Sequence, residues 1–342
     1  MSAPPTPLPA VGRPRSVMLL PETLARNVYD DACLAEIARS TRLAGFIAAD
    51  EVGGRGGDLA DVEVLFTGWG CGRIDGDVLD ALPRLRAIFY AGGTVKNWAG
   101  DEVWRREIIV SNAYAANAIP VAEYTVGAIL FSLKCGWHCL GRQQRERRYP
   151  WPVVEAWGGF GATIGLFSLG AIGRLVCERL RPFGFELLAS DPGATAADAR
   201  TLGVELVPLP ELFARSQIVS LHAPLLPETE GIITGRLVGA LPPHGTLINT
   251  ARGGLIREDE LAAVLLQRPD LTAVLDVLRD EPPPENHPLL AQPNVFVTPH
   301  IAGAMGRERW RLGRLMVDEF QRWQRGEPLR WRIRPEKLPQ LA

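Results

Sequence analysis

Short apolar runs alternate along the first third of the chain with longer stretches of helical periodicity. The strand-like runs are Ser16–Leu20, Val62–Thr67, Ala87–Tyr90 and Ile108–Ser111. Parallel strands need crossover connections between them, and helices usually supply these. The alternation therefore predicts an α/β domain with a largely parallel sheet.

A long apolar stretch then runs from Val121 to about Leu140 and predicts a helix. It follows Pro120, carries Glu123 in its first turn and has almost no charge along its middle. A helix without a polar face is expected to be buried, here between two domains. No stretch approaches the roughly 18–20 apolar residues that span a membrane, so we expect no membrane partner.

The alternation restarts after a connection rich in Trp and Pro, from Gly141 to Gly161. The strands expected here are Thr163–Phe167, Glu186–Ser190, Ile218–His222, Thr246–Asn249, Thr272–Asp276 and Val295–Val297. Together with the helices between them, these strands form a complete doubly wound pattern. A last helix, around Arg307 to Gly326, and its short tail are too small for a domain, so we expect them to pack on the first one.

These patterns divide the chain into three parts. Residues 1–15 hold five prolines and no apolar core of signal-peptide length, and we expect a disordered leader there. A first domain is expected from residues 16–117 together with 309–342, and a second from residues 118–308.

Composition and charge narrow the function classes. The 342 residues carry a net charge of -2, which implies no strongly basic face and argues against a nucleic-acid partner. The five cysteines are odd in number and irregularly spaced, which is typical of reduced thiols in a cytoplasmic protein. Cys135, His138 and Cys139 share one stretch, but no further ligand is nearby, so we expect no metal site.

The clearest local motif is the turn from Ser168 to Gly173, which follows the apolar strand Thr163–Phe167. A glycine turn that opens a helix can hold a pyrophosphate on backbone N–H groups. The residues expected to do so are Ser168, Leu169, Gly170, Ala171, Ile172 and Gly173. Ser168 stands where the G-x-G-x-x-G pattern has its first glycine, so it must adopt the conformation that glycine normally supplies.

Asp191 strengthens this interpretation. It ends the next predicted strand, 18 residues after Gly173. A carboxylate there accepts hydrogen bonds from the ribose hydroxyls of a dinucleotide and repels a 2′-phosphate, which favours NAD over NADP. The alternative is an ordinary Asp-Pro turn. Two other glycine-rich stretches, Gly53–Gly57 and Gly70–Gly76, lack such an acidic residue and are interpreted as loops of the first domain.

Three side chains suited to one reaction follow three consecutive strands of the second domain: Arg252, Glu281 and His300. Arginine matches a carboxylate with its planar fork, histidine can donate a proton, and a neighbouring carboxylate favours protonated histidine. The carboxyl ends of parallel strands meet at one sheet edge, so we expect the three side chains to lie close together. This set predicts the reduction of a 2-oxoacid. Each residue alone could instead be structural.

The same segments resemble the NAD-dependent D-isomer-specific 2-hydroxyacid dehydrogenase family over roughly residues 60 to 315. The matching stretches are Asn117–Thr125, Ser168–Gly173, His222–Thr229, Ile248–Gly253, Asp276–Pro282 and Thr298–Gly303. The resemblance implies two Rossmann-like domains, a flavodoxin-like substrate domain and a doubly wound NAD-binding domain, with an interdomain cleft.

The resemblance also implies roles for individual residues. Arg252 would bind the substrate, and His300 would be the acid/base paired with Glu281. The cofactor would further meet the following residues: His222, Pro224, Thr229, Thr250, Ala251, Arg252, Asp276 and His300. Asp276 would hold the nicotinamide carboxamide, and His222 and Pro224 would line the adenine side.

The substrate loop departs from the family pattern. Its glycines remain, but Lys96 stands where an acidic residue is common, and Trp98 follows Asn97. Gly92, Gly93 and Thr94 are the candidates for holding the substrate carboxylate, while the side chains that select the rest of the substrate stay open. Trp69 either reaches the cleft or belongs to the core.

The resemblance further implies a homodimer through a segment like Gln143 to Trp157, which carries Tyr149 and Trp151. Two alternatives stay open. The chain could be an NADH-sensing regulatory protein that kept the fold. It could also be a related dehydrogenase acting on phosphite or formate, although formate oxidation needs no Glu–His pair.

Overall fold

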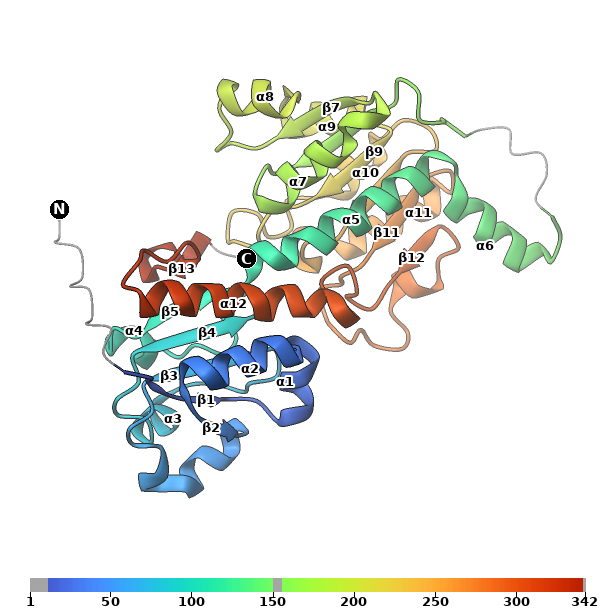
Figure 1. Ribbon diagram of the computed structural model, residues 1–342. Helices are drawn as coiled ribbons and strands as arrows, with labels where there is room; N and C mark the ends of the chain where they lie inside the picture. Colours follow the sequence, from blue (N-terminus) through green and yellow to red (C-terminus); the bar gives the residue numbers. More distant parts are fainter. Residues whose placement is uncertain (1–11, 150–155, 341–342) are drawn as a thin grey trace. The chain divides into compact units, whose positions relative to one another are not determined.

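The computed structural model describes residues 12–149 and 156–340 and contains two compact units (Figure 1). Unit 1 comprises the chain up to Asn117 and the stretch from Ala304 onward, and unit 2 is Ala118–Gly303. The sequence placed the first boundary after residue 117, as observed, and the return to unit 1 at residue 309, whereas the structure returns at Ala304. Residues 1–11 of the expected leader lie outside the described residues, and its last residue, Arg15, already begins a strand.

Unit 1 holds one six-stranded sheet in the order β2-β1-β3-β4-β5-β13. The first five strands pair in parallel, and β13 pairs antiparallel with β5. This is the flavodoxin-like order that the family resemblance implied. The strands are β1 (Arg15–Met18), β2 (Arg42–Phe46), β3 (Val64–Gly68), β4 (Ala87–Ala91), β5 (Ile109–Asn112) and β13 (Arg332–Ile333).

The C-terminal helix belongs to unit 1, as the sequence predicted. Phe320 of this helix packs on Phe66 and Phe89 of the sheet, with ring centroids 5.2 and 5.6 Å apart. In Figure 1 the helix lies along the sheet beside α1 and α2. The helices of unit 1 are α1 (Glu22–Val28), α2 (Asp31–Ser40), η1 (Ala49–Leu59), α3 (Gly76–Asp80), α4 (Asp101–Arg105), η5 (Gly306–Glu308), α12 (Arg309–Gln324) and η6 (Pro335–Gln340).

Unit 2 holds a seven-stranded parallel sheet in the order β12-β11-β10-β9-β6-β7-β8. The strand order reverses between β6 and β9, which makes this pair the switch point of a doubly wound sheet. The strands are β6 (Thr163–Phe167), β7 (Glu186–Ser190), β8 (Glu205–Leu206), β9 (Ile218–Leu221), β10 (Thr246–Asn249), β11 (Thr272–Leu275) and β12 (Val295–Val297).

The strands of unit 2 feed two separate hydrophobic cores, one on each face of the sheet. In β10, Leu247 joins the core under α9 to α11, whereas Ile248 joins the core under α7, α8 and the long helix α5 (Tyr114–Leu133). Successive side chains of a strand point to opposite faces, which produces this division. The helices are α7 (Ala171–Leu180), η2 (Arg181–Phe183), α8 (Ala196–Leu202), α9 (Leu209–Arg215), α10 (Gly235–Gly239), η3 (Gly253–Leu255), α11 (Glu258–Gln267) and η4 (Pro288–Ala291).

The long central helix differs from its prediction. The sequence indicated one helix from Val121 to about Leu140, but the structure has two, α5 (Tyr114–Leu133) and α6 (Gly136–Glu146). Pro120 lies inside α5, early enough that its missing N–H removes only one hydrogen bond near the helix start. Cys135 adopts a left-handed conformation (φ 51°), which ends the first helix and turns the chain into the second.

Helix α5 also corrects the expectation about membrane-length segments. By length and composition alone its 20 residues are apolar enough to cross a membrane, with a mean hydropathy of 1.3. Within the described residues it is the one helix that passes this test, and 56% of the apolar window is buried inside the protein. Core helices meet the same criterion, so this helix is weak evidence for a membrane segment.

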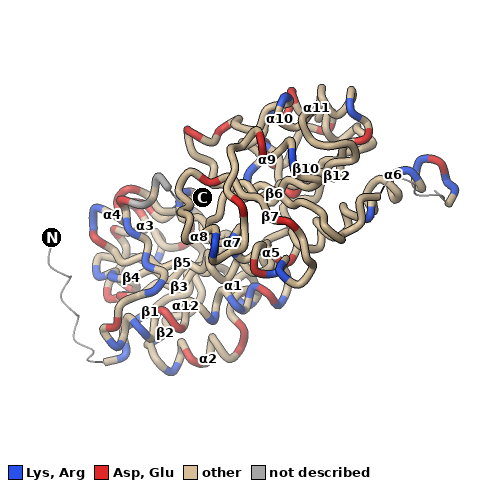
Figure 2. Tube along the Cα trace, turned by 90° about the horizontal axis from the view of Figure 1, so that it is seen from above, with Lys and Arg blue, Asp and Glu red and all other residues tan. Residues whose placement is uncertain are grey.

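Charged residues of both signs are interspersed along both units, as Figure 2 shows. The C-terminal turn of α6 is an example, where Arg142 and Arg148 both pair with Glu146 at 3.0 and 2.5 Å. Exposed pairs of this kind contribute little to stability. Cys33, Cys71 and Cys177 are buried, while Cys135 and Cys139 are half-buried.

Candidate active site

The turn after β6 has the backbone shape that the sequence required. Ser168 adopts a φ of 79°, in the left-handed region that glycine usually occupies. Its N–H donates to Ser190 O at 3.0 Å, and its Oγ lies 3.3 Å from Asp191 Oδ2. These two bonds hold the serine in a conformation that costs a non-glycine residue free energy.

Helix α7 begins directly after this turn and leaves its first-turn N–H groups uncapped. Gly170 is the N-cap and supplies no side chain, and the first helical bond is Arg174 N–H to Gly170 O, at 3.1 Å. A Cβ on Gly170 would meet no protein atom closer than 3.9 Å, so the space above the turn is open. An uncapped helix start facing open space is suited to binding a phosphate.

Gly173 shows why the third glycine of the motif is needed. A Cβ at this position would collide with the carbonyl oxygen of Ser168. Only glycine therefore lets the first turn of α7 pack against the end of β6.

Asp191 lies beside the same turn, at the end of β7. Its Oδ2 accepts the N–H of Leu169 at 2.6 Å, and its Oδ1 accepts the N–H of Gly193 at 2.7 Å. The carboxylate thus fixes the turn after β6 from the neighbouring strand. Each carboxylate oxygen offers two lone pairs, and Ser168 and Leu169 already use both on Oδ2, so one acceptor site remains on Oδ1 for a ribose hydroxyl.

His222 follows β9, the other strand of the switch point. Its ring is buried, lies close to Gly173, and has no hydrogen-bond partner at either nitrogen. Burial lowers the pKa of His222 to about 4. A buried imidazole without a hydrogen-bond partner in the protein can form a hydrogen bond with a bound dinucleotide.

The His222 ring should make the cofactor-free protein less stable in mild acid. The unfolded chain binds a proton near pH 6.5 and the folded chain only near pH 4, so stability is lost as pH falls between these values. From pH 6.5 to 5 we expect wild type to lose about 2 kcal/mol more than His222→Leu. Urea unfolding of both proteins at each pH measures the difference, and parallel losses would contradict it.

Arg252 is positioned by a tight turn after β10. Asn249 braces this turn: its Oδ1 accepts Ala251 N–H at 3.0 Å, and its Nδ2 donates to Arg252 O at 2.9 Å. The guanidinium donates to Ala251 O at 2.6 Å. Burial lowers the pKa of Arg252 while the negative charge of Glu281 opposes this shift, and an arginine remains a cation at neutral pH in either case.

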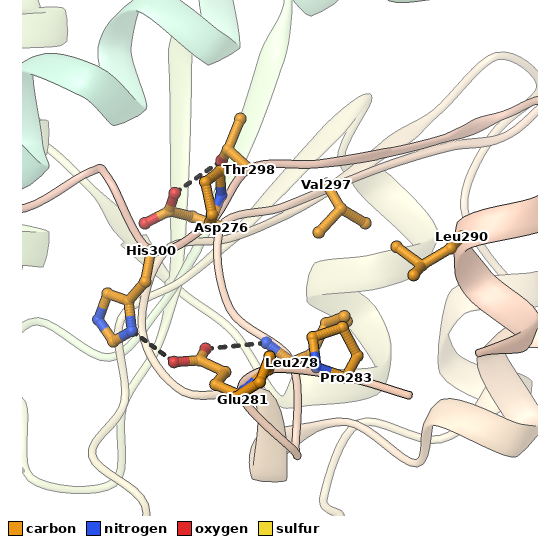
Figure 3. A pocket seen from close by; sticks show the side chains of 10 residues that line it. Asp276, Leu278, Glu281, Pro283, Leu290, Val297, Thr298 and His300 are labelled. Atoms are coloured by element: carbon orange, nitrogen blue, oxygen red, sulfur yellow. Dashed lines mark hydrogen bonds and ion pairs between the residues drawn. The ribbon is translucent and has the colours of Figure 1, made fainter. Parts of the chain in front are cut away.

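Glu281 and His300 form a hydrogen-bonded pair in unit 2 (Figure 3). His300 Nδ1 lies 2.7 Å from Glu281 Oε2, and Glu281 Oε1 accepts the N–H of Leu278 at 3.1 Å. The pair is part of a pocket of about 440 Å³, lined also by Leu290, Val297 and Thr298. With Nδ1 directed at the carboxylate, His300 keeps Nε2 for a ligand.

His300 itself is strained, with a φ of 54°. Its N–H donates to Asp276 O and Thr298 O, both at 2.9 Å. Backbone strain of this kind persists where surrounding contacts over-determine the conformation, and it clusters at functional sites.

Asp276 supplies most of those contacts. Its buried carboxylate accepts Thr298 Oγ1–H at 2.6 Å (Figure 3). It also accepts the N–H groups of Ile301 and Ala302 at 2.9 Å each. Three donors from one segment fix the loop that carries His300. The resemblance implied that Asp276 holds the nicotinamide carboxamide. The carboxylate would have to accept that hydrogen bond with a lone pair that these three bonds leave unused.

The remaining predicted cofactor residues lie on loops at the same sheet edge. Thr229 Oγ1 donates to Pro224 O at 2.6 Å and closes the loop after β9. Thr250 and Ala251 are buried, and Thr250 Oγ1 lies 3.0 Å from Thr125 Oγ1 on α5. Ala171 and Ile172 form the first turn of α7.

The predicted substrate loop lies in unit 1, after β4. Gly92 N–H already donates to Tyr90 O at 2.9 Å, which leaves Gly93 and Thr94 as the backbone donors of this loop. Thr94 Oγ1 accepts Lys96 N–H at 3.3 Å. Trp69 is half-buried and packs against the core of unit 1.

Several residues of this site were missed by sequence reasoning. Asn249, Tyr124 and Thr298 hold the loops that carry Arg252 and His300, and Tyr124 Oη lies 2.8 Å from Thr298 Oγ1. Their only signal was that each falls within a stretch that resembles the family. Across the described part of the chain, no three His, Cys, Asp or Glu side chains gather as metal ligands would.

Comparison with known proteins identifies the family. Residues 128–302 match the model described as "D-isomer specific 2-hydroxyacid dehydrogenase, NAD binding domain". The chain is 34% identical to (S)-sulfolactate dehydrogenase of Chromohalobacter salexigens, over 73% of this chain and 81% of that protein. This chain belongs to the D-isomer specific 2-hydroxyacid dehydrogenase family.

Other family relatives are longer than this chain. It is 32% identical to D-3-phosphoglycerate dehydrogenase of Methanocaldococcus jannaschii, over 82% of this chain and 53% of that protein. The chain thus spans about half the length of the phosphoglycerate dehydrogenases that it matches.

Solved structures agree on the fold. D-mandelate dehydrogenase of Rhodotorula graminis superposes with a TM-score of 0.78 at 22% identity, over 94% of this chain and 98% of that chain. A glyoxylate reductase from Paecilomyes thermophila gives a TM-score of 0.76 at 22% identity, over 96% and 100%. Both likenesses show the two-domain Rossmann architecture that the sequence predicted.

The site fits the cofactor of this family. The uncapped start of α7, the open space above Gly170 and the unpartnered His222 ring all lie at the switch point of the NAD-binding domain. Asp191, at the end of the neighbouring strand, suits an adenosine ribose. A dinucleotide held there would extend toward the loops after β10 to β12.

Proposed function

We propose that this family member is an NAD-dependent dehydrogenase that interconverts a small 2-oxoacid and the corresponding D-2-hydroxyacid. The observation that carries the proposal is the 2.7 Å contact between His300 Nδ1 and Glu281 Oε2, on loops that neighbour the one bearing Arg252. The three groups together provide a carboxylate anchor, a proton donor and a partner for that donor.

Each side chain has a distinct task in reducing a 2-oxoacid. Arg252 binds the substrate carboxylate and polarises the keto group. His300 donates its Nε2 proton to the keto oxygen, and Glu281 stabilises the imidazolium before transfer. NADH, when bound, supplies the hydride to the carbonyl carbon. In the reverse direction His300 accepts the hydroxyl proton.

NAD is the proposed cofactor rather than NADP, because Asp191 would lie close to a 2′-phosphate. The carboxylate charge would repel that phosphate, while the ribose hydroxyls of NAD can donate hydrogen bonds to it. Gly93 and Thr94 are proposed to hold the substrate carboxylate through their N–H groups.

We also propose a cytoplasmic homodimer. The support for the dimer is exposed apolar side chains within and after α6: Leu140, Tyr149 and Trp157 are 49%, 82% and 42% exposed. Trp151, which also belongs to this segment, lies outside the described residues. The buried cysteines Cys33, Cys71 and Cys177, which form no disulfide, support a reducing compartment.

A single screen tests the proposed reaction. Glyoxylate, hydroxypyruvate, pyruvate, phenylpyruvate and branched 2-oxoacids are each incubated with the protein and either NADH or NADPH, and loss of absorbance at the nicotinamide band is followed. We expect turnover with at least one oxoacid and an NADH preference of about tenfold or more, the factor that 1.4 kcal/mol gives.

The outcomes separate the alternatives. Tight NADH binding without turnover on any oxoacid would indicate the sensor instead, and a preference for NADPH would overturn the role given to Asp191. Turnover of NAD with phosphite alone would replace the substrate class while keeping the site.

A further inference from the structure

Unit 2 contains a second His–Glu pair, formed by residues that do not belong to the proposed active site. Glu258, the first residue of α11, places its Oε2 3.2 Å from His287 Nε2. Both side chains are largely buried, at 13% and 12% exposure. His287 also caps η4, because its Nδ1 accepts the N–H of Leu289 at 3.4 Å.

These contacts fix the proton on the His287 ring. Since Nδ1 accepts the Leu289 N–H, a neutral ring carries its proton on Nε2 and donates it to Glu258. The other carboxylate oxygen, Oε1, accepts the N–H of Arg279 at 2.7 Å. Glu258 therefore hydrogen-bonds the chain at two points, the N–H of Arg279 and the ring of His287. Glu281 lies in the segment between these two residues.

The hydrogen bond between Glu258 and Arg279 lies next to the one that holds the carboxylate of Glu281. Leu278 N–H donates to Glu281, and the next N–H along the chain, that of Arg279, donates to Glu258. Consecutive amides are thus held by two different carboxylates. A displacement of the Leu278–Arg279 peptide would move Glu281 relative to His300.

The same peptide also contacts the turn that carries Arg252. A Cβ on Gly253 would collide with the backbone of Leu278 and Arg279, so the two loops lie in direct contact there. The Leu278–Arg279 peptide therefore contacts both the turn that carries Arg252 and the carboxylate of Glu281. Glu258, at the start of α11, holds this peptide through the N–H of Arg279.

We propose that Glu258 and His287 are positioning residues that hold Glu281 against His300 and so set the efficiency of proton transfer. The proposal rests on the proposed dehydrogenase function. Neither residue touches the reacting groups, and both act through the loop from Arg279 to His287. A misplacement of about 1 Å in such a loop is enough for roughly a 10²-fold loss of rate.

Two variants separate the contacts of the pair. Glu258→Ala removes both hydrogen bonds, the one with Arg279 N–H and the one with the His287 ring. His287→Asn keeps a side chain that can cap η4 but is too short to reach Glu258, so it tests the pair without the cap. Asp259→Asn is the matched control, because Asp259 is the exposed neighbour of Glu258 and lines the same surface pocket as His287.

The readouts are kcat, the dissociation constant of NADH by fluorescence, and the pH dependence of kcat for 2-oxoacid reduction. For Glu258→Ala we expect kcat to fall about 10- to 100-fold, with NADH affinity within about twofold of wild type, because the turn after β6 is untouched. The alkaline limb of the pH profile should move to lower pH, since a displaced carboxylate stabilises the His300 imidazolium less. His287→Asn should show the same pattern more weakly, and Asp259→Asn should match wild type.

A fall in kcat without movement of the alkaline limb, in both variants, would overturn the proposal and indicate a purely structural role. Unchanged kcat in both would overturn it as well. If Glu258→Ala does not fold, the result for His287→Asn decides.

Failure of the proposed function would look different. If wild type turns over no 2-oxoacid, the titration of the His300 ring is followed by NMR in wild type and His287→Asn. A midpoint at lower pH in the variant supports the positioning role, and identical titrations reject it, whatever reaction the site performs.

Discussion

Replacing His300 by Gln should lower kcat for 2-oxoacid reduction by about 10²- to 10⁴-fold, the usual contribution of a positioned general acid. Gln can still accept and donate hydrogen bonds, but it cannot transfer a proton. The turn from Ser168 to Gly173 follows β6 and His300 follows β12, with three strands of the sheet between them, so NADH should bind with its wild-type affinity. Stopped-flow or steady-state absorbance gives kcat, and NADH fluorescence gives the affinity.

The chain offers a closely matched control for this variant. His244 also has a positive φ, 62°, but it lies in the turn before β10, at the opposite end of the strands. His244→Gln makes the same chemical change at a similar backbone conformation and should leave kcat within about twofold of wild type. Equal losses in both variants would mean that the backbone conformation, rather than proton transfer, explains the effect at His300.

Replacing Arg252 by Ala should lower kcat/KM for the oxoacid by about 10²- to 10³-fold or more, because the variant loses a buried cation aimed at developing negative charge. Arg252→Lys keeps the charge but lacks the planar fork that matches a carboxylate, so we expect an intermediate loss. Both variants should bind NADH, and initial rates over a range of oxoacid concentrations separate kcat from KM.

Arg257→Lys controls for the Arg252→Lys exchange. Arg257 follows the same turn but is exposed, and it bonds Gly231 O and Glu260 rather than the pocket. We expect no change in kcat/KM there. If Arg252→Ala kept the wild-type kcat/KM, Arg252 would be an ion-pair partner of Glu281 and another group would bind the substrate.

Much of the fold was predictable because buried parallel strands are continuous apolar runs. Strands β6, β7, β10 and β12 were predicted with the bounds that the structure shows. The strands that sequence reasoning missed all lie at sheet edges. Edge strand β2 is interrupted by Gly45 and only partly buried, and β8 and β13 are two residues long, so none has an apolar pattern strong enough to detect.

The candidate site was predictable to the level of the sheet edge. The rule that ligands bind at the carboxyl ends of parallel strands indicated that Glu281 and His300 lie close together. It could not indicate which backbone groups hold them, because the loops after β11 and β12 have no periodicity to read. Asp276 accepts hydrogen bonds from the N–H groups of Ile301 and Ala302, and Glu258 accepts one from Arg279. These bonds depend on loop conformations that only the folded chain defines.

The division of the central strands of unit 2 between two cores restricts how this protein can change in evolution. Deleting one residue within β10 would send Leu247 and Ile248 to the wrong faces and would shift Arg252 by one position along the turn. Insertions and deletions should therefore be tolerated in the loops that precede the strands and eliminated within β10 to β12. New substrates are accessible to this scaffold through loop exchange and point substitution, while the lengths of its central strands stay fixed.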